Sequence, residues 1–250
     1  MKTKLGESIM RSEFETAADE RLFQIKQSVV PLMGPHWNIH SNLFIKRVSL
    51  SRIIYFNNLY SLIKEIPGVI CEFGVQWGAS LSLLINLRGM IEPYNYSRKI
   101  IGFDTFSGFE TPHLKDGDLV SKGDYSSIES YCEQLEEILA LQESLSPLAH
   151  IKKFELVKGD ASLTINEWIQ KNPHTIISMA IFDMDVYQPT KDVLEKIIPR
   201  LTKGSVLVFD ELNCPKFPGE TLALMEVLGV NNLKLRRDPN QPYCAWAVFE

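Results

Sequence analysis

The sequence lacks three features that would assign it to a common class. Its cysteines, Cys71, Cys132, Cys214 and Cys244, are scattered without a C-x-x-C spacing, which excludes a zinc-finger pattern and a disulfide framework. No run approaches the roughly 18 consecutive apolar residues of a membrane span, so no membrane partner is expected. The first fifteen residues become charged before an apolar run can build, so we expect no signal peptide and a cytoplasmic protein with reduced thiols.

The sequence also lacks a surplus of positive charge. It has 26 Lys and Arg against 31 Asp and Glu, a net charge of −5. A dedicated nucleic-acid binder needs a basic surface, so no nucleic-acid partner is expected. Of the 250 residues, 45% are hydrophobic and 23% are charged. This composition is typical of a globular protein, and the length allows one large α/β domain.

From residue 67 onward, short β-branched runs alternate with helical segments. Strands are predicted at 69–73, 99–103, 153–159, 175–183 and 205–210, and helices at 80–90, 128–142, 162–171, 190–201 and 219–229. This alternation, with nearly continuous apolar strands, indicates a parallel sheet covered on both faces. Runs 232–237 and 243–249 have no helix between them and predict an antiparallel edge hairpin. We therefore expect a seven-stranded, mostly parallel α/β sheet.

Two regions lie outside this alternation. Residues 1–66 are predicted to form a helical extension, with helices at 13–30 and 49–66 and a loop at 31–38, before an α/β domain at 67–250. The extension could cover a site or join two copies in a homodimer. The polar, Gly- and Asp-rich segment 105–127 is longer than most loops of a compact domain, so it is either a mobile surface loop or a lid.

The first strand of the sheet leads into a glycine-containing turn. In a sheet of this kind, ligands bind beyond the carboxyl ends of the strands. Gly74 and Gly78, four residues apart, let the backbone approach a ligand at a helix N-terminus, or they simply make a tight turn. The spacing is not G-x-G-x-x-G, which disfavours a nicotinamide or flavin. Glu72 would repel phosphates and suits a ligand that carries an amino group.

Carboxylates also follow the next two strands. Asp104 ends the second strand, where an acidic residue commonly accepts hydrogen bonds from ribose hydroxyls. Asp160 follows the third strand and either lines the same crevice or caps the next helix. With Glu72, these residues favour a nucleoside with a positive centre over a dinucleotide.

The fourth and fifth strands end in pairs of acidic residues, Asp183 with Asp185 and Asp210 with Glu211. One strand–helix–strand unit separates the pairs, so they can converge at neighbouring strand ends. Three carboxylates at one point need a cation, and hard oxygen ligands suit Mg²⁺, Mn²⁺ or Ca²⁺. Asp183, Asp210 and Glu211 are the candidate metal ligands, which leaves Asp185 free to remove a proton. The alternatives are that one or two of them cap helices or turns, or that Asp185 is the metal ligand and Asp183 is structural.

These residues carry a family resemblance. The strings PGVICEFGVQWGASLSLL, RKIIGFDTFSGFE and IFDMDVYQPTKDVLEKIIPRLTKGSVLVFDELN resemble the macrocin O-methyltransferase family. Members of that family methylate sugar hydroxyls of antibiotics and related glycosides with S-adenosylmethionine and Mg²⁺. The resemblance runs from about residue 47 to 240 and implies the Rossmann-like fold of class I methyltransferases.

The resemblance also implies a role for each motif residue. Asp183, Asp210 and Glu211 would bind the metal, and Asp185 would be the general base. The residues implied around S-adenosylmethionine are Glu72, Gly74, Val75, Gly78, Ser80, Asp104, Thr105, Phe106, Gly159, Asp160, Ala161 and Asp183. Two positions depart from the family pattern: Glu211 stands where the family often has Asp, and Glu110 where a proline is common.

The expected function is metal-assisted O-methylation of a sugar, a nucleotide sugar or a glycoside. On the substrate side, His113 and Glu220 are candidates. Two alternatives stay open: methylation of an aromatic diol, which would also chelate the metal, and a non-catalytic protein that binds S-adenosylmethionine.

Overall fold

The computed structural model describes residues 12–250, which separate into two compact units. One unit ends at Ile54 and the other spans Tyr55–Glu250. The domain boundary predicted after residue 66 stays a prediction. Within the described residues, no helix has the length and apolar character needed to cross a membrane, and the cytoplasmic location stays a prediction.

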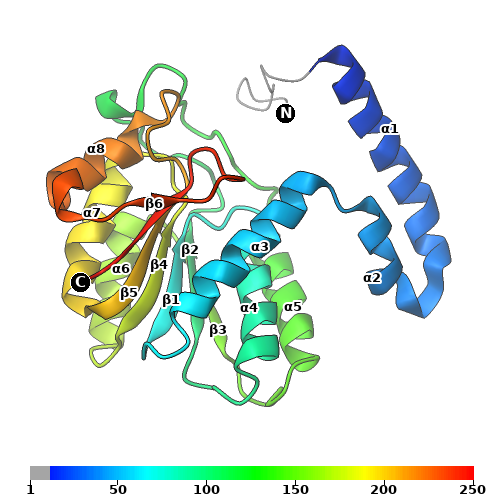
Figure 1. Cartoon of the computed structure of the whole chain (residues 1–250), viewed down its shortest axis with the longest axis horizontal. Coiled ribbons are helices and arrows are strands. Elements are labelled where there is room, and N and C mark those ends of the chain that lie inside the picture. Colours follow the sequence, from blue (N-terminus) through cyan, green and yellow to red (C-terminus); the bar gives the residue numbers. More distant parts are fainter. Residues whose placement is uncertain (1–11) are drawn as a thin grey trace. The chain divides into compact units, whose positions relative to one another are not determined.

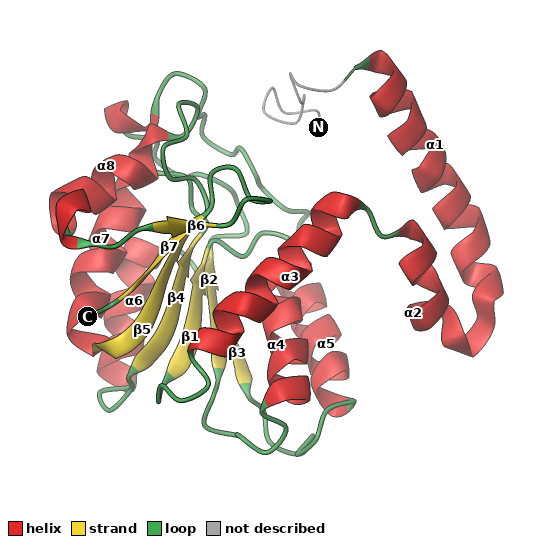
Figure 2. Ribbon diagram, viewed as in Figure 1, coloured by secondary structure: helices red, strands yellow, loops and turns green. Residues whose placement is uncertain are grey.

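The first unit is helical (Figure 2). Helix α1 (Glu13–Val29) begins at a capping box, in which the Ser12 side chain accepts from the Glu15 N–H and the Glu15 carboxylate accepts from the Ser12 N–H. This reciprocal pair satisfies two of the N–H groups that a helix start leaves open. The helix predicted at 13–30 therefore forms.

The loop predicted at 31–38 is wrong. The chain there forms the 3₁₀-helix η2 (Val30–His36) and the short helix α2 (Trp37–His40), followed by η3 (Ser41–Phe44). Proline fixes φ near the helical value, so it suits the start of a short helical turn. Gly34, with a φ of 63°, interrupts the helical path, which is why several short turns form in place of one long helix.

The second unit contains the seven-stranded sheet, which confirms the predicted fold class. Its strands are β1 (Val69–Phe73), β2 (Ile100–Asp104), β3 (Phe154–Lys158), β4 (Ile177–Phe182), β5 (Leu201–Phe209), β6 (Arg236–Arg237) and β7 (Ala245–Val248). The spatial order is β3-β2-β1-β4-β5-β7-β6, with β1 to β5 parallel and β7 antiparallel to both neighbours. Strand β6 is shorter than the predicted run 232–237: residue 232 belongs to η6 (Val230–Asn232), and residues 233–235 lie outside any helix or strand.

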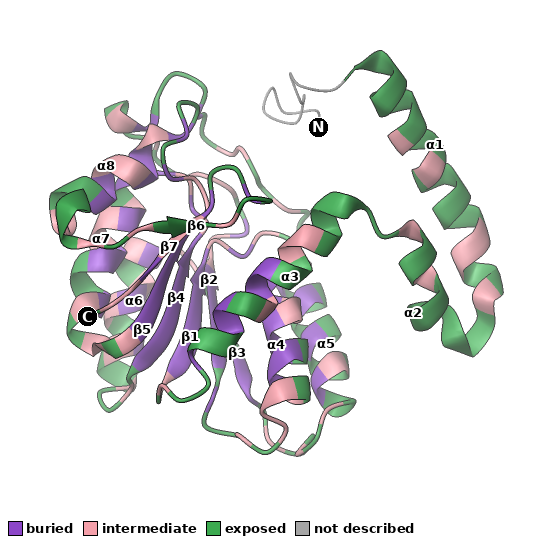
Figure 3. Cartoon of the chain, in the orientation of Figure 1, coloured by how far each residue is buried: buried purple, intermediate pink, exposed green. Residues whose placement is uncertain are grey.

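Helices cover both faces of the sheet. They are α3 (Arg47–Leu62), α4 (Ala79–Ile91), α5 (Tyr131–Ser144), α6 (Ala161–Lys171), α7 (Tyr187–Ile197) and α8 (Pro218–Val227), with the 3₁₀ turns η4 (Leu114–Asp116) and η5 (Ile198–Arg200). The second half of α3 lies with α4 and α5 on one face, and α6, α7 and α8 lie on the other (Figure 1). The central strands are buried between these layers (Figure 3), as parallel strands require.

A row of phenylalanines marks the carboxyl edge of the sheet. Phe73, Phe103, Phe182 and Phe209 are the aligned residues of β1, β2, β4 and β5, and each is fully buried. Their rings stack across the sheet, with centroids 4.8 Å, 5.5 Å and 5.1 Å apart between neighbours. Because these strands are in register at this row, the residue after each phenylalanine also lies beside its neighbours.

Buried charges away from this edge are paired. Arg88 of α4 donates to Glu143 of α5 at 2.5 Å, and Lys153 lies 2.8 Å from the same carboxylate. Arg98 pairs with Glu92 at 2.9 Å. Such pairing is the usual condition for a charge inside a protein.

Candidate functional site

The residues that follow the phenylalanine row form the base of the candidate site. The sheet hydrogen bonding continues one residue past the row. Gly74 donates to the Phe103 carbonyl at 2.9 Å, Asp183 to Phe73 at 2.8 Å and Asp210 to Phe182 at 3.0 Å. Asp104, Gly74, Asp183 and Asp210 therefore lie side by side in strand order, about 4.8 Å from one to the next. The expected convergence of Asp183 and Asp210 follows from this register.

Asp104 holds the loops on both sides of it. Its Oδ2 atom accepts from the N–H groups of Val75 at 2.6 Å and Gln76 at 2.8 Å, and its Oδ1 atom accepts from Phe106 at 2.5 Å. A carboxylate has about four acceptor positions, so the backbone occupies three of them. Asp104 thus fixes the glycine loop after β1 and the start of segment 105–127, and its contact to a ribose stays a prediction.

The two glycines of the loop meet different requirements. Gly74 has a φ of 93°, and a Cβ there would overlap the carbonyl group of Asp183, with the carbonyl carbon 2.5 Å away. Gly78 has a φ of 76° at the N-cap of α4, where a Cβ would overlap the Leu135 side chain. Both positions are in the left-handed region, which favours glycine. The overlap at Gly74 is with backbone, whereas the Leu135 side chain at Gly78 could move.

The other residues implied around the cofactor lie near this loop or after β3. Glu72 is 1% exposed inside β1, and Ser80 is buried in the first turn of α4. Asp160 is the N-cap of α6, where its Oδ1 atom accepts from the Ser162 N–H at 2.9 Å. The structure thus bears out the capping alternative for Asp160, and its contact with an adenine stays a prediction.

A cluster of carboxylates surrounds the ends of β4 and β5. Burial and the neighbouring Glu211 and Asp210 raise the pKa of Asp185 to about 8. Glu220, in the first turn of α8, is fully buried, and burial together with Asp185 holds its pKa well above the ordinary value. Asp185 has a φ of 62°, a conformation that non-glycine residues adopt mainly where the surrounding structure imposes it.

Helix α8 holds the loop that carries Glu211. The Oε1 atom of Glu220 accepts from the Glu211 N–H at 3.1 Å, and the Thr221 hydroxyl accepts from the Asn213 N–H at 2.9 Å. Within the described residues, the buried Oε2 atom of Glu220 has no hydrogen-bond partner. The sequence named Glu220 only as a substrate-side candidate; its packing against the metal candidates follows from the fold of the β5–α8 loop.

Two thiols that the sequence did not single out also contact the cluster. The Cys244 thiol donates to the Oδ1 atom of Asp210, with an Sγ–Oδ1 distance of 3.0 Å. Burial and a hydrogen bond to Glu211 raise the pKa of Cys214 to about 11, so that thiol stays protonated. Cys244 immediately precedes β7, 34 residues after Asp210, and no sequence spacing signals that contact.

The donor chemistry of this cluster fits a hard divalent cation, because its side chains are carboxylates. Burial, and after it the charges of neighbouring carboxylates, raise the pKa of both Asp185 and Glu220. Among residues 12–250, however, the structure contains no group of at least three His, Cys, Asp or Glu side chains that is arranged to hold a metal ion. The metal role of Asp183, Asp210 and Glu211 stays a prediction.

Segment 105–127 is anchored near its middle. Asp116 is 1% exposed, and its carboxylate accepts from the Tyr187 N–H at 2.5 Å and from the His113 N–H at 2.6 Å. Lys115 pairs with Glu226 of α8. His113 caps η4 through its Nδ1 atom. These contacts fix the segment to α7 and α8, and they give His113 a structural task; the function of the segment as a lid stays a prediction.

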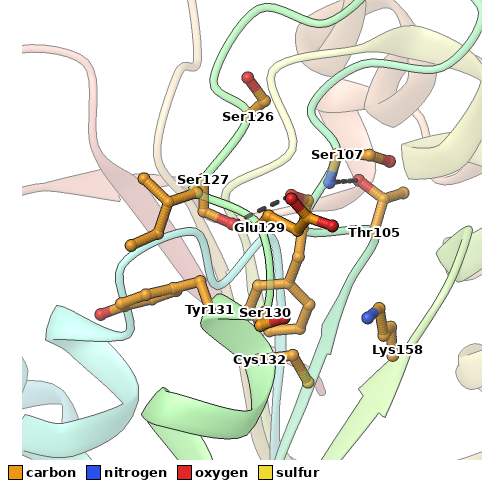
Figure 4. Close-up of a pocket in the computed structure, with 11 residues that line it drawn as sticks. Thr105, Ser107, Ser126, Ser127, Glu129, Ser130, Tyr131, Cys132 and Lys158 are labelled. Carbon is orange, nitrogen blue, oxygen red and sulfur yellow. Dashed lines mark hydrogen bonds between the residues drawn. The ribbon is translucent and has the colours of Figure 1, made fainter.

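A pocket of about 370 Å³ opens beyond β2 and β3. Its lining comes from both ends of segment 105–127, from the residues that lead into α5 and its first turn, and from the end of β3 (Figure 4). The lining residues are Thr105, Phe106, Ser107, Ser126, Ser127, Ile128, Glu129, Ser130, Tyr131, Cys132 and Lys158. Thr105 and Phe106 belong to the predicted cofactor residues, whereas the run from Ser126 to Cys132 was not predicted because its composition carries no motif.

Comparison with protein-family models gives no match, and comparison with curated proteins gives none. Solved structures do match. The crystal structure of CalS11, described as a calicheamicin methyltransferase, is 37% identical with a TM-score of 0.92, over 96% of this chain and 95% of that one. An apo structure of CalS11, described as a TDP-rhamnose 3'-O-methyltransferase, is 36% identical with a TM-score of 0.85, over 96% of each chain.

The O-methyltransferase NovP is a more distant structural match. It is 16% identical with a TM-score of 0.56, over 79% of this chain and 78% of that one. At this identity the likeness concerns the fold alone. The CalS11 matches, in contrast, cover almost the whole chain at an identity that shows common family membership.

Proposed function

Because the chain belongs to the macrocin O-methyltransferase-like family of S-adenosylmethionine-dependent sugar O-methyltransferases, we propose that it methylates a hydroxyl of a sugar carried on a nucleotide. One observation carries this proposal. Asp104, Gly74, Asp183 and Asp210 stand in one row at the carboxyl edge, between a glycine loop and an acidic cluster. A relative with 36% identity is described as acting on TDP-rhamnose, which supports a nucleotide sugar as the acceptor class.

The proposed cofactor site uses the loops that Asp104 holds. Glu72, Gly74 and Gly78 would surround the methionine part of S-adenosylmethionine, where a carboxylate favours the amino group. Asp104 would contact the ribose hydroxyls through its remaining acceptor position. Asp160 and Ala161 would border the adenine. The pocket that includes Thr105 and Phe106 lies next to these residues and supports this placement.

The proposed chemistry assigns the base to Asp185. S-adenosylmethionine supplies a methyl group on a sulfonium, so the task of the chain is to align an acceptor oxygen with that carbon. Asp185 would take the proton of the acceptor hydroxyl. Its left-handed backbone and the Asp116 contact to Tyr187, two residues later, fix the turn from which it acts. The acidic surroundings would also favour a cationic sulfonium over a neutral ligand.

We propose that a hard divalent cation, Mg²⁺ by its family, belongs to the same site. Asp183, Asp210 and Glu211 would hold it, with oxygen donors of the kind that Mg²⁺ prefers. When bound, the cation would lower the pKa of the acceptor hydroxyl and orient it. Glu211, where the family often has Asp, still offers a carboxylate, and Glu220 holds its backbone in place.

A turnover assay tests the proposed function. The chain is incubated with S-adenosylmethionine and, in separate reactions, TDP-rhamnose, a phenyl rhamnoside and catechol. With TDP-rhamnose as the acceptor, we expect a product that is heavier than TDP-rhamnose by one CH₂. Chelation of divalent cations should lower the rate at least about 100-fold, and added Mg²⁺ should restore it. Activity that survives chelation would contradict the metal proposal alone. If catechol alone is methylated, the aromatic-diol alternative is favoured. If the chain binds S-adenosylmethionine but transfers no methyl group, the non-catalytic alternative is favoured.

We propose further that the first unit mediates a homodimer. Between residues 12 and 54 no side chain is buried, and large apolar side chains are exposed, among them Leu32, Trp37 and Leu43. Such a surface is usually covered by a partner, and a second copy of the chain is always present.

Light scattering during size exclusion tests the dimer. We expect twice the mass of one chain for the wild type and the mass of one chain for the double variant Trp37→Asp and Leu43→Asp. The matched control is Leu145→Asp, which also charges a highly exposed apolar position, 89% exposed, but in the second unit. It should stay dimeric. A monomeric wild type would contradict the proposal.

A further inference from the structure

Tyr125 stands at the end of segment 105–127 in a constrained conformation. Its φ is 62°, which lies in the left-handed region that residues other than Gly, Asn and Asp rarely adopt. The chain just before it is fixed by two hydrogen bonds, from Phe109 N–H to the Asp124 carbonyl at 3.1 Å and from Gly123 N–H to the Phe109 carbonyl at 2.8 Å. The conformation of Tyr125 is thus imposed by the closed base of the segment, as at many ligand sites.

The Tyr125 ring completes a group of three aromatic side chains. Its centroid lies 5.4 Å from that of Phe109 and 6.4 Å from that of Phe217. Phe217 is buried and immediately precedes α8, in the loop between Glu211 and Glu220. Tyr125 itself is 37% exposed, in contrast to the buried Phe217. The group therefore joins segment 105–127 to the loop that carries the acidic cluster.

Tyr125 is close enough to the acidic cluster for the charges of that cluster to act on its hydroxyl. Burial, and then the charges of Asp185, Glu211 and Asp183, raise its pKa above the ordinary value, so the phenol keeps its proton. Within the described residues this hydroxyl makes no hydrogen bond. It is therefore available to donate to a ligand bound near the acidic cluster.

The chain that follows Tyr125 leads directly into the pocket. Ser126 and Ser127 line it, and the Ser127 hydroxyl donates to the Phe106 carbonyl at 3.0 Å (Figure 4). Tyr125 thus stands between the pocket beside the predicted cofactor residues and the acidic cluster. A methyl acceptor must occupy this interval, because its oxygen has to reach both the methyl donor and the base.

We propose that Phe109, Tyr125 and Phe217 form the subsite for the sugar ring of the acceptor, with the Tyr125 hydroxyl donating to a sugar oxygen. This inference rests on the proposed function and specifies the part of the site that recognises the acceptor. The negative face of an aromatic ring attracts the C–H groups on one face of a pyranose. A deoxysugar, with more C–H surface, suits such a group better than a fully hydroxylated sugar.

Binding of TDP-rhamnose to the full chain loaded with S-adenosylhomocysteine, which cannot transfer a methyl group, tests the subsite. By calorimetry, Tyr125→Phe should weaken binding about threefold to tenfold, the effect of one neutral hydrogen bond. Tyr125→Asn should weaken it by at least about tenfold, because the stacking ring is lost as well. Asparagine tolerates a positive φ, so this variant keeps the backbone. In turnover, the same variants should raise KM for the sugar.

Tyr94→Asn is the matched control, since Tyr94 is 76% exposed in the connection before β2. It should bind TDP-rhamnose as the wild type does, and all variants should keep the wild-type affinity for S-adenosylhomocysteine. If the wild type binds TDP-rhamnose and Tyr125→Asn binds it equally tightly, the subsite is refuted while the proposed function stands. If the wild type neither binds nor methylates this sugar, the proposed function fails and the subsite fails with it.

Discussion

Asp185→Asn is expected to lower kcat for methyl transfer by about 10²–10⁴-fold, the usual contribution of a general base, while S-adenosylmethionine binds almost as before. The side chain stands in the turn between β4 and α7, beside the row that includes Asp183 and Asp210. The amide has nearly the same shape as the carboxylate but cannot accept a proton from a sugar hydroxyl.

Asparagine is also the substitution least disruptive to this backbone. Asp185 has a φ of 62°, and Asn is among the few residues that adopt such values readily. The turn keeps its other anchor, the hydrogen bond from the Tyr187 N–H to Asp116. A loss of activity in this variant therefore reports the missing base rather than a displaced turn.

Single-turnover kinetics and calorimetry with S-adenosylmethionine measure the two parts of this prediction. Asp192→Asn is the matched control, because Asp192 lies on α7 and its carboxylate accepts from the nearby Gln188 side chain. That variant should react at the wild-type rate. Asp185→Asn with a near-wild-type rate would remove Asp185 from the base role, and a parallel loss of cofactor affinity would assign it to the cofactor site.

Gly74→Ala is expected to cost about 2–5 kcal/mol of unfolding free energy, combining a left-handed backbone with an overpacked contact. The φ of Gly74 is 93°, and the added Cβ would overlap the Asp183 carbonyl group. Backbone cannot rotate away as a side chain does, so the loop after β1 or the turn after β4 must shift. A shift of this kind between cofactor and base should reduce methyl transfer by about 100-fold.

Gly123→Ala separates the two contributions. Gly123 has a φ of 83°, close to that of Gly74, but a Cβ there would meet nothing within 4 Å. It should cost only the conformational part, about 1–2 kcal/mol, and leave the affinity for S-adenosylmethionine unchanged. Urea unfolding and calorimetry give both quantities. Equal destabilisation by the two alanines, with cofactor binding intact in both, would show that the contact between Gly74 and Asp183 has no role in the site.

Much of the fold could be predicted because its signals are local. The apolar runs that became β1, β2, β4 and β7 and the helices between the parallel strands follow from periodicity and from stops such as Pro67-Gly68. The segment 31–38 could not be assigned in the same way. Its prolines and Gly34 are typical of a loop, but the same residues also fit a series of short helical turns.

The candidate site was only partly predictable. Asp183, Asp210 and Glu211 follow strands, and a strand end is visible in a sequence. In the structure, Asp104 accepts from N–H groups of a neighbouring loop and Asp160 caps α6. The sequence around these residues is equally compatible with these structural roles and with contacts to a cofactor. Cys244 and Tyr125 reach the acidic cluster from distant segments, and no local pattern records such a contact.

The sequence by itself determined the order of strands and helices, the glycines of the first loop and the acidic residues near the ends of the parallel strands, because these depend on neighbours along the chain. Only the tertiary structure decided that Phe73, Phe103, Phe182 and Phe209 stand in register, that Asp116 anchors segment 105–127, and that the Tyr125 ring lies beside that of Phe217. Those arrangements arise from hydrogen bonding between strands and from packing between residues far apart in the chain, which periodicity does not encode.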